Sequence, residues 1–157
     1  MSGYTSPLHF ARTETERRDP FASWVREDRP FFASGASHIL ADLFIQLHRH
    51  EGFRAEYILP RWGKPGSHVY ATNDIWCFDF DGWTRREELL TTVMRDHLAV
   101  DLDWECDVVR VVQPLEAFCA TYGHRPPHSF PYLPWKRAYE YIGRFPLGPP
   151  DHEAPSP

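Results

Sequence analysis

Residues 68–82 read HVYATNDIWCFDFDG, two short alternating segments that meet at Asn73-Asp74. This residue pair is typical of tight turns between antiparallel strands, so the stretch predicts a β-hairpin. If Asn73 and Asp74 form a two-residue loop, His68 lies directly opposite Asp79. Paired side chains have Cβ atoms about 4.5–5.5 Å apart, which brings an imidazole and a carboxylate within hydrogen-bonding reach. We therefore expect a pair in which the carboxylate orients a histidine base.

The two faces of this hairpin differ in chemistry. One face is apolar and carries Val69, Ala71, Trp76, Phe78 and Phe80. The other face carries the polar and reactive groups His68, Tyr70, Cys77, Asp79 and Asp81. Because Asp81 shares the face of Asp79, it is a second candidate partner for His68, and Cys77 is a candidate reactive thiol. Antiparallel sheets often have one solvated face, so the polar face is also compatible with simple exposure to water.

A helix is predicted upstream of the hairpin. After the small residues 34–36, apolar side chains recur at helical spacing at Ile39, Leu40, Leu43, Phe44 and Leu47. The pattern predicts a largely buried helix from near Ser37 to near Glu51, with Gly52 as its stop. A side chain in the first turn meets unpaired N–H groups and the positive end of the helix dipole, which stabilise an anion. Serine is also a preferred helix N-cap, which gives Ser37 an ordinary structural interpretation.

The remaining pattern completes an α+β fold, in which a central helix packs on a small antiparallel sheet. Further strands are predicted at 53–59 and 107–112, and further helices at 84–98, 114–122 and around 135–142. Thr84 and Glu87 have the spacing of a capping box for the second of these helices. We divide the chain into an N-terminal arm (1–30), a single core (31–123) and a tail rich in proline and aromatic residues (124–157), with the last residues disordered.

Three motifs together resemble papain-like and transglutaminase-like thiol enzymes: GASHILA at 35–41, SHVY at 67–70 and WCFDFDGW at 76–83. In those families a Cys begins the central helix, a His begins a following strand, and an Asp or Asn lies on the neighbouring strand. The resemblance covers about residues 34–95. It implies that Ser37 occupies the nucleophile position, that His68 is the base and that Asp79 orients it.

The residue at the nucleophile position departs from the family pattern, because Ser37 stands where these enzymes carry Cys. A thiolate is a ready nucleophile near neutral pH, whereas a serine hydroxyl needs activation by a general base. Three explanations are open: an inactive relative retained for binding, a working serine nucleophile, or a cysteine replaced to trap an inactive form. The resemblance implies acyl transfer at an amide or thioester carbonyl, as in peptidases, deamidases and transglutaminases. The alternative is a non-catalytic module that binds a protein partner through the same cleft or through tail residues such as Trp135 and Tyr139.

Composition argues against other classes of function. The net charge of -5 and the lack of a basic block argue against nucleic acid as a partner. No apolar run approaches the roughly 20 residues that span a bilayer, and the N-terminus lacks the layout of a secretory signal. The three cysteines and the histidines His38, His48 and His50 lack the spacing of a disulfide framework or a zinc site. We expect a cytoplasmic protein without metal or cofactor that acts on, or binds, a protein or peptide.

Overall fold

The computed structural model describes residues 3–150 and has an α+β fold. Within this range, one antiparallel sheet has the strand order β4-β3-β2-β1-β5. Its strands are β1 (Arg54–Pro60), β2 (His68–Thr72), β3 (Trp76–Asp79), β4 (Gly82–Arg85) and β5 (Cys106–Arg110). The helices are α1 (Glu14–Arg18), α2 (Pro20–Trp24), α3 (Asp28–Ala33), α4 (Ser37–Leu47), α5 (Arg86–Val100), α6 (Leu115–Tyr122) and α7 (Pro134–Ile142). Short 3-10 turns are η1 (Pro7–Phe10), η2 (Arg61–Gly63) and η3 (Pro127–Ser129).

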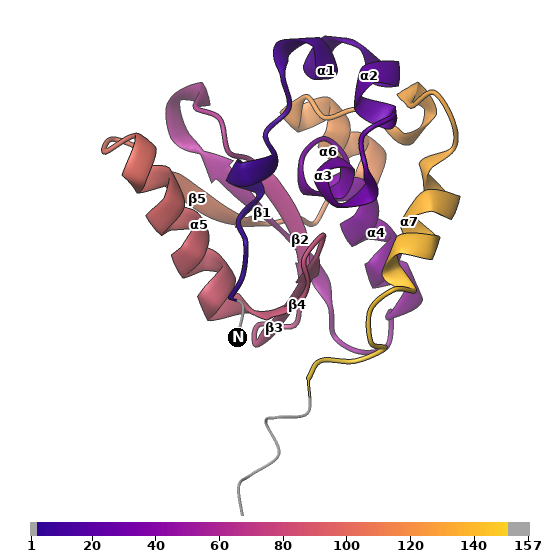
Figure 1. Cartoon of the computed structure of the whole chain (residues 1–157). Helices are drawn as coiled ribbons and strands as arrows, with labels where there is room; N and C mark the ends of the chain where they lie inside the picture. Colours follow the sequence, from indigo (N-terminus) through magenta and orange to yellow (C-terminus); the bar gives the residue numbers. More distant parts are fainter. Residues whose placement is uncertain (1–2, 151–157) are drawn as a thin grey trace, which may run out of the picture.

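The sheet is covered on both faces (Figure 1). Helix α4 lies against β2 and β3, and α7 packs against α4. Helix α5 contacts β3 and β4, and η1 lies between α5 and α3. Every residue of β2 and β3 is consequently buried, so the polar face of the hairpin is not a solvated face. Within residues 3–150, no helix is long and apolar enough to cross a membrane.

Aromatic packing joins α4 to the sheet. Phe44 is almost fully buried and stacks on Phe78, with 4.4 Å between the ring centroids. The helix begins at Ser37, as predicted, but ends at Leu47 rather than near Glu51. His48 ends it, because its ring stacks on Phe44 and its Nδ1 lies 3.0 Å from the Phe44 carbonyl oxygen. These contacts lie at the last turn of α4, and the chain then leads into β1.

The predicted hairpin forms, but its predicted two-residue loop is wrong. The observed pairs are Ala71 with Phe78 and Thr72 with Cys77, a shift of two positions from the expected register. The cause is a longer loop, 73–76, held by side chains. The Asn73 carboxamide oxygen accepts the backbone N–H groups of residues 75 and 76, at 3.1 and 2.8 Å. Because the side-chain period of a strand is two, this shift keeps His68 and Asp79 on one face, while Phe80, beyond the end of β3, contacts His68 rather than lying with Phe78 as predicted.

A strand and a turn replace the predicted start of the second helix. Residues 82–85 form β4, which pairs with β3, and α5 begins at Arg86. Thr84 therefore lies in the strand, and the predicted capping box with Glu87 does not form. Gly82 adopts φ +81°, which permits a tight turn directly after β3. A capping box does occur at Thr13, which caps α1 together with Glu16.

The segments predicted as arm and tail both contribute core side chains. The arm (1–30) brings Tyr4 into the main hydrophobic cluster, and its Phe10 and Trp24 are partly buried against that cluster. Helix α7 adds Ala138 and Tyr141 to the same cluster. Helix α6 follows Pro114 and ends at Gly123 in the left-handed conformation, as the sequence pattern predicts. The predicted disorder at the C-terminus concerns residues 151–157, which lie outside the described residues.

Candidate functional site

His68 and Asp79 form a buried hydrogen-bonded pair. The Nε2 atom of His68 lies 2.8 Å from Oδ2 of Asp79, and the two residues are 1% and 3% exposed. In the observed register they are diagonal neighbours, rather than directly opposed residues, on the face of the sheet covered by α5. The other carboxylate oxygen, Oδ1, accepts the backbone N–H of Asp81 at 2.9 Å. Both oxygens of Asp79 are therefore held in place.

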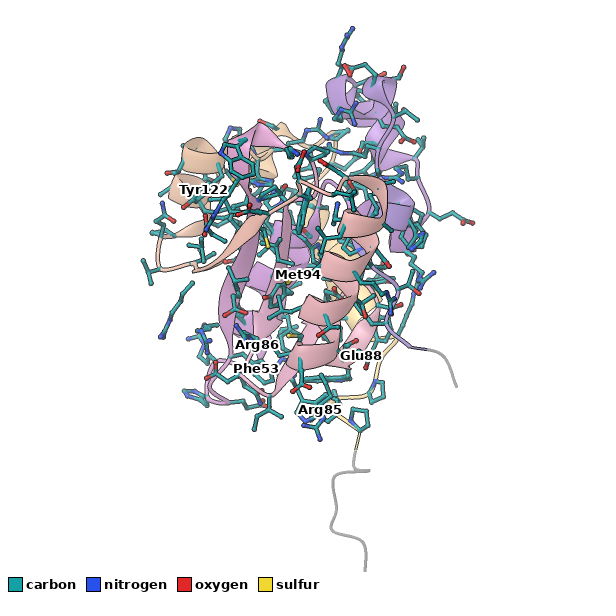
Figure 2. All side chains as sticks on the ribbon, turned by 90° about the vertical axis from the view of Figure 1, so that its left-hand side faces the viewer. Phe53, Arg85, Arg86, Glu88, Met94 and Tyr122 are labelled. Carbon is teal, nitrogen blue, oxygen red and sulfur yellow. The ribbon has the colours of Figure 1, made fainter. Side chains whose placement is uncertain are left out.

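Tyr4 is a third member of this group. Its hydroxyl donates a hydrogen bond of 2.5 Å to the same Oδ2 that bonds His68. Burial, followed by the charge of Asp79, raises the pKa of Tyr4 well above its ordinary value, so the hydroxyl stays protonated and donates. The backbone N–H of Tyr4 donates to the Glu88 carboxylate at 2.8 Å. Glu88 lies in the first turn of α5, where Figure 2 labels it. Sequence analysis missed Tyr4, because its contact with Asp79 spans 75 positions of the chain and leaves no local pattern.

The pairing with Asp79 determines the tautomer of His68. An ionised carboxylate only accepts hydrogen bonds, so Nε2 carries the proton and Nδ1 presents a lone pair. Nδ1 is buried and has no hydrogen-bond partner within residues 3–150. Buried polar atoms are nearly always hydrogen-bonded, so the unpaired Nδ1 is unusual. A ring nitrogen that is oriented but unpaired can accept a proton, as a general base must.

Ser37 lies beside this histidine at the start of α4. Its Oγ accepts the backbone N–H of Val69 at 3.2 Å, so the hydroxyl contacts the peptide that follows His68. The structural alternative is wrong: the N-cap is Ala36, and the Ser37 side chain makes no cap hydrogen bond. The first helical hydrogen bond runs from the Leu40 N–H to the Ala36 carbonyl, which leaves the preceding N–H groups at the open end of the helix. Within the described chain, no hydrogen bond joins Ser37 directly to His68.

Asp81, the second candidate partner, has a different role. One of its carboxylate oxygens pairs with Arg29 at 2.7 Å, and the other accepts the backbone N–H of Thr5 at 3.1 Å. Burial raises the pKa of Asp81, and the hydrogen bond from Arg29 opposes that rise. Asp81 thus fastens the N-terminal segment to the sheet, whereas Asp79 contacts the imidazole.

The cysteine thiols lie in environments that disfavour the thiolate. Burial raises the pKa of Cys77 to about 12, and the nearby Asp79 adds to that rise. Burial likewise raises the pKa of Cys119 to about 11 and the pKa of Cys106 to a smaller extent. A nucleophilic thiol needs a lowered pKa, so these environments argue against Cys77 as the reactive group.

Next to the His–Asp pair, the polar face of the sheet holds a second buried carboxylate. Glu56 accepts the hydroxyl hydrogen of Tyr70 at 2.6 Å and pairs with Arg86 at 2.8 Å and Arg54 at 3.3 Å. The two arginines neutralise the carboxylate, and burial, followed by the hydrogen bond to Glu56, raises the pKa of Tyr70. On that face this network includes Tyr70, and the Glu56 carboxylate is paired as a buried charge requires, although Nε of Arg54 has no hydrogen-bond partner within residues 3–150.

A recess of about 210 Å³ borders the Ser37–His68 region. Its lining does not include Ser37 or His68 themselves, but it includes Ser34, three positions before α4, and Gly66 and Ser67, directly before β2. The opposite wall comes from η1 and from Arg12, so the N-terminal segment forms one side of the approach to the site. A substrate that reached Ser37 would therefore lie between this segment and the Gly66–Ser67 loop.

No group of three or more histidine, cysteine or acidic side chains within residues 3–150 is arranged to hold a metal ion. No protein-family model matches the chain, and searches of curated proteins and of solved structures find no significant match either. The geometry of Ser37, His68, Asp79 and Tyr4 is therefore the available indication of function.

Proposed function

We propose that the chain carries the catalytic core of a papain-like or transglutaminase-like acyl-transfer protein. In this proposal Ser37 occupies the nucleophile position, His68 is the base and Asp79 holds the base in one tautomer. One observation carries it: a buried imidazole is held at Nε2 by a carboxylate and has a free Nδ1, next to the residue that begins the central helix. Ser37 begins α4, His68 begins β2 and Asp79 lies on the neighbouring strand β3. This order of elements supports a papain-like or transglutaminase-like core.

The proposed reaction begins with attack of the residue-37 side chain on an amide or thioester carbonyl carbon. Nδ1 of His68 takes the proton from the nucleophile, and a covalent bond forms between the nucleophile and the carbonyl carbon. The backbone N–H groups of residues 37 and 38 stabilise the negative oxygen that develops. His68 then returns its proton to the leaving amine or thiol, and water or an amine acceptor releases the acyl group. The N–H of Nε2 stays bonded to Asp79 throughout.

The residue at position 37 limits this chemistry. The Ser37 hydroxyl accepts the Val69 N–H and is not hydrogen-bonded to His68, so its proton has no direct route to the base in this structure. A thiol at the same position is more acidic and forms an ion pair with an imidazole, which does not require transfer of the proton during attack. We therefore expect weak or absent acyl transfer with Ser37 and a reactive group with Cys at this position.

The experiment compares the Ser37→Cys protein with the double variant that also carries His68→Ala, using iodoacetamide and peptide mapping. The thiol at position 37 should be alkylated about tenfold or more faster than Cys106, because a thiolate next to an imidazole is populated near neutral pH. Removing the imidazole should slow alkylation at position 37 and leave the Cys106 rate unchanged, which makes Cys106 an internal control. Alkylation no faster than that of Cys106, or a rate independent of His68, contradicts the proposal.

A second candidate function, binding of a protein or peptide without catalysis, is favoured by one observation. Tyr132, Leu133 and Tyr139 are large apolar side chains of the C-terminal segment, and each is more than half exposed. Aromatic side chains are enriched at protein interfaces. A pull-down with Tyr139→Ala should lose a partner under this alternative and retain it with His68→Ala, which is the reverse of what the catalytic proposal requires.

A further inference from the structure

Three arginines gather beside Gly35, just before the start of α4. Arg12 and Arg17 come from the N-terminal segment, and Arg125 comes from the loop after α6. Together with Gly35, Gly123 and His124 they line a recess of about 250 Å³. The chain as a whole carries a net charge of -5, so this concentration of positive charge is local.

The guanidinium groups in this recess have unused donors. Nε of Arg12 and Nη1 of Arg125 are buried and have no hydrogen-bond partner within residues 3–150. Two other donors bind main-chain oxygens: Nη1 of Arg17 donates to the Arg12 carbonyl at 2.7 Å, and Nη2 of Arg125 donates to the Arg17 carbonyl at 3.3 Å. A buried donor of a charged group without an acceptor destabilises the folded protein, because the donor has lost its hydrogen bonds to water. An acceptor that enters the recess would remove this destabilisation at two positions.

Acidic neighbours offset only part of the charge in the recess: Glu14 pairs with Arg17 at 3.2 Å, and Asp19 acts on Arg125 as a lesser cause than burial. Burial, then repulsion from Arg125 and Arg17, lowers the pKa of Arg12 to about 10, and Glu16 opposes the shift only as its smallest cause. Arg12 nevertheless stays protonated near neutral pH. Burial and the charge of Arg12 lower the pKa of His124 to about 4, so that ring is neutral and adds no charge. The three guanidinium groups therefore repel one another, and a bound anion would reduce this repulsion.

The cluster lies close to the proposed nucleophile position. A β-carbon placed on Gly35 would come within 3.2 Å of Arg12 side-chain atoms, so the Arg12 side chain packs directly over Gly35, two positions before Ser37. Arg12 and Arg17 also line the recess that borders Ser34 and Ser67. The two recesses share these arginines, and each is also lined by a residue that lies just before α4, Gly35 in one and Ser34 in the other.

We propose that Arg12 and Arg125 bind a carboxylate of the substrate, so that the acyl donor is an acidic compound such as a peptide with an acidic side chain or a terminal carboxylate near the reacting carbonyl. The inference rests on the proposed acyl-transfer function. Two unpaired N–H donors on separate guanidinium groups match the two oxygens of one carboxylate, and arginine is the residue that recognises this planar group best. The arginines act in binding and positioning, and His68 and Asp79 retain their roles.

The first experiment measures carboxylate binding without any catalysis. Succinate is titrated into the ¹⁵N-labelled protein, with succinamide and sodium chloride at matched ionic strength as controls. The amide signals of Gly35 and Gly123 should shift and saturate with succinate alone, while Gly52, which lies outside the recess, should stay in place. Arg12→Gln should weaken this binding about tenfold, the effect expected for a charged hydrogen bond, whereas Arg18→Gln, whose side chain is 77% exposed, should not change it.

Several outcomes of this titration overturn the inference. Equal shifts with sodium chloride or succinamide show that the recess does not select a carboxylate. Saturable shifts with inorganic phosphate but none with succinate contradict the assignment of the anion as a carboxylate. Unchanged succinate binding in Arg12→Gln removes the cluster as its cause. Because none of these results depends on His68, the titration can fail or succeed independently of the proposed catalytic function.

The second experiment connects the site to the reacting position. In the Ser37→Cys protein, iodoacetate and iodoacetamide alkylate the same thiolate and release iodide, and they differ by one carboxylate. The rate with iodoacetate divided by the rate with iodoacetamide should fall about threefold or more in the Arg12→Gln background, because the Arg12 cation attracts the anionic reagent. The same ratio should stay unchanged with Arg18→Gln. His68→Ala should lower both rates and leave their ratio unaltered. An Arg12-independent ratio contradicts the assignment of the acidic group to the substrate, even where succinate binds.

Discussion

His38, the residue after the proposed nucleophile position, should make the fold sensitive to acid. Its side chain lies in the interior and is 2% exposed, and its Nε2 lies 2.7 Å from the Arg125 carbonyl oxygen, to which it donates. Burial, followed by repulsion from His124, lowers the pKa of His38 to about 3, and the hydrogen bond to the carbonyl opposes this shift. Arg12 and Arg125 face the same ring and lower the pKa further. The ring is therefore neutral in the folded protein at every pH at which the protein is handled.

The sign and size of the effect follow from the two pKa values. The unfolded chain binds a proton at His38 below about pH 6.5, whereas the folded chain does not until about pH 3. Between these values the unfolded state binds more protons, so stability rises with pH, is complete above about pH 6.5 and is lost as the pH falls. At about pH 5 the loss is about 2 kcal/mol, from about 1.36 kcal/mol per pH unit over about 1.5 units. His124, with a pKa of about 4, contributes a similar loss of about 2 kcal/mol.

Urea unfolding of the wild type and of His38→Gln, at about pH 7.5 and about pH 5, isolates this effect. Glutamine keeps an amide donor for the Arg125 carbonyl and does not titrate. Both proteins lose the contributions of the same carboxylates on acidification, so the difference between their losses belongs to His38. The wild type should lose about 2 kcal/mol more than the variant, while His128→Gln, at an exposed position, should behave as the wild type. Equal losses in wild type and His38→Gln would refute the reasoning.

Three further changes test the site and its supports. Replacing Tyr4 with Phe removes the hydroxyl that shares Asp79, so alkylation of the cysteine variant described above should slow several-fold, by about 1 kcal/mol of lost positioning, with the chain still folded by circular dichroism. Phe44→Ala should lower the free energy of unfolding by about 3–5 kcal/mol in urea, because it leaves a cavity between α4 and the sheet. Gly82→Ala should cost about 2 kcal/mol or more, because its β-carbon would come within 2.6 Å of an aromatic ring. Gly52→Ala, at a similar positive φ with nothing within 4 Å, should cost about 1 kcal/mol by the same assay.

The features that could be predicted from the sequence are those that local patterns specify. The periodicity after Ser37 locates α4 and its start, and Pro114 and Gly123 locate both ends of α6. The placement of His68 and Asp79 on one face also follows from the sequence. That placement survived an error in the loop, because the register shifted by two positions rather than one. A shift of one position would have moved Asp79 to the opposite face.

The features that could not be predicted depend on contacts between distant segments. Tyr4 bonds Asp79 across 75 positions, and the Arg125 guanidinium reaches the Arg17 carbonyl across 108. No periodicity or motif encodes such a contact, because each partner is an ordinary side chain in its own segment. Strand β4 could not be predicted for another reason, because its four residues are too few to show a clear alternating pattern. Thr84 within it also has the spacing to Glu87 that is typical of a helix cap. The α+β class and the His68–Asp79 pair could therefore be predicted from the sequence. The long-range contacts by which other segments cover this pair could not.

Asp79, at the end of β3, and Asp81, two positions after it, explain how one short segment can both orient His68 and exclude water from it. Asp79 points to the imidazole and to Tyr4, and Asp81 binds Arg29 and the backbone of Thr5. Both carboxylates thus hold the N-terminal segment against the sheet, and this segment forms a wall of the recess beside Ser37. Excluding water strengthens the His–Asp interaction, because the effective dielectric constant falls around it. The orientation of His68 is therefore coupled to the docking of the N-terminal segment, and neither can be loosened without weakening the other.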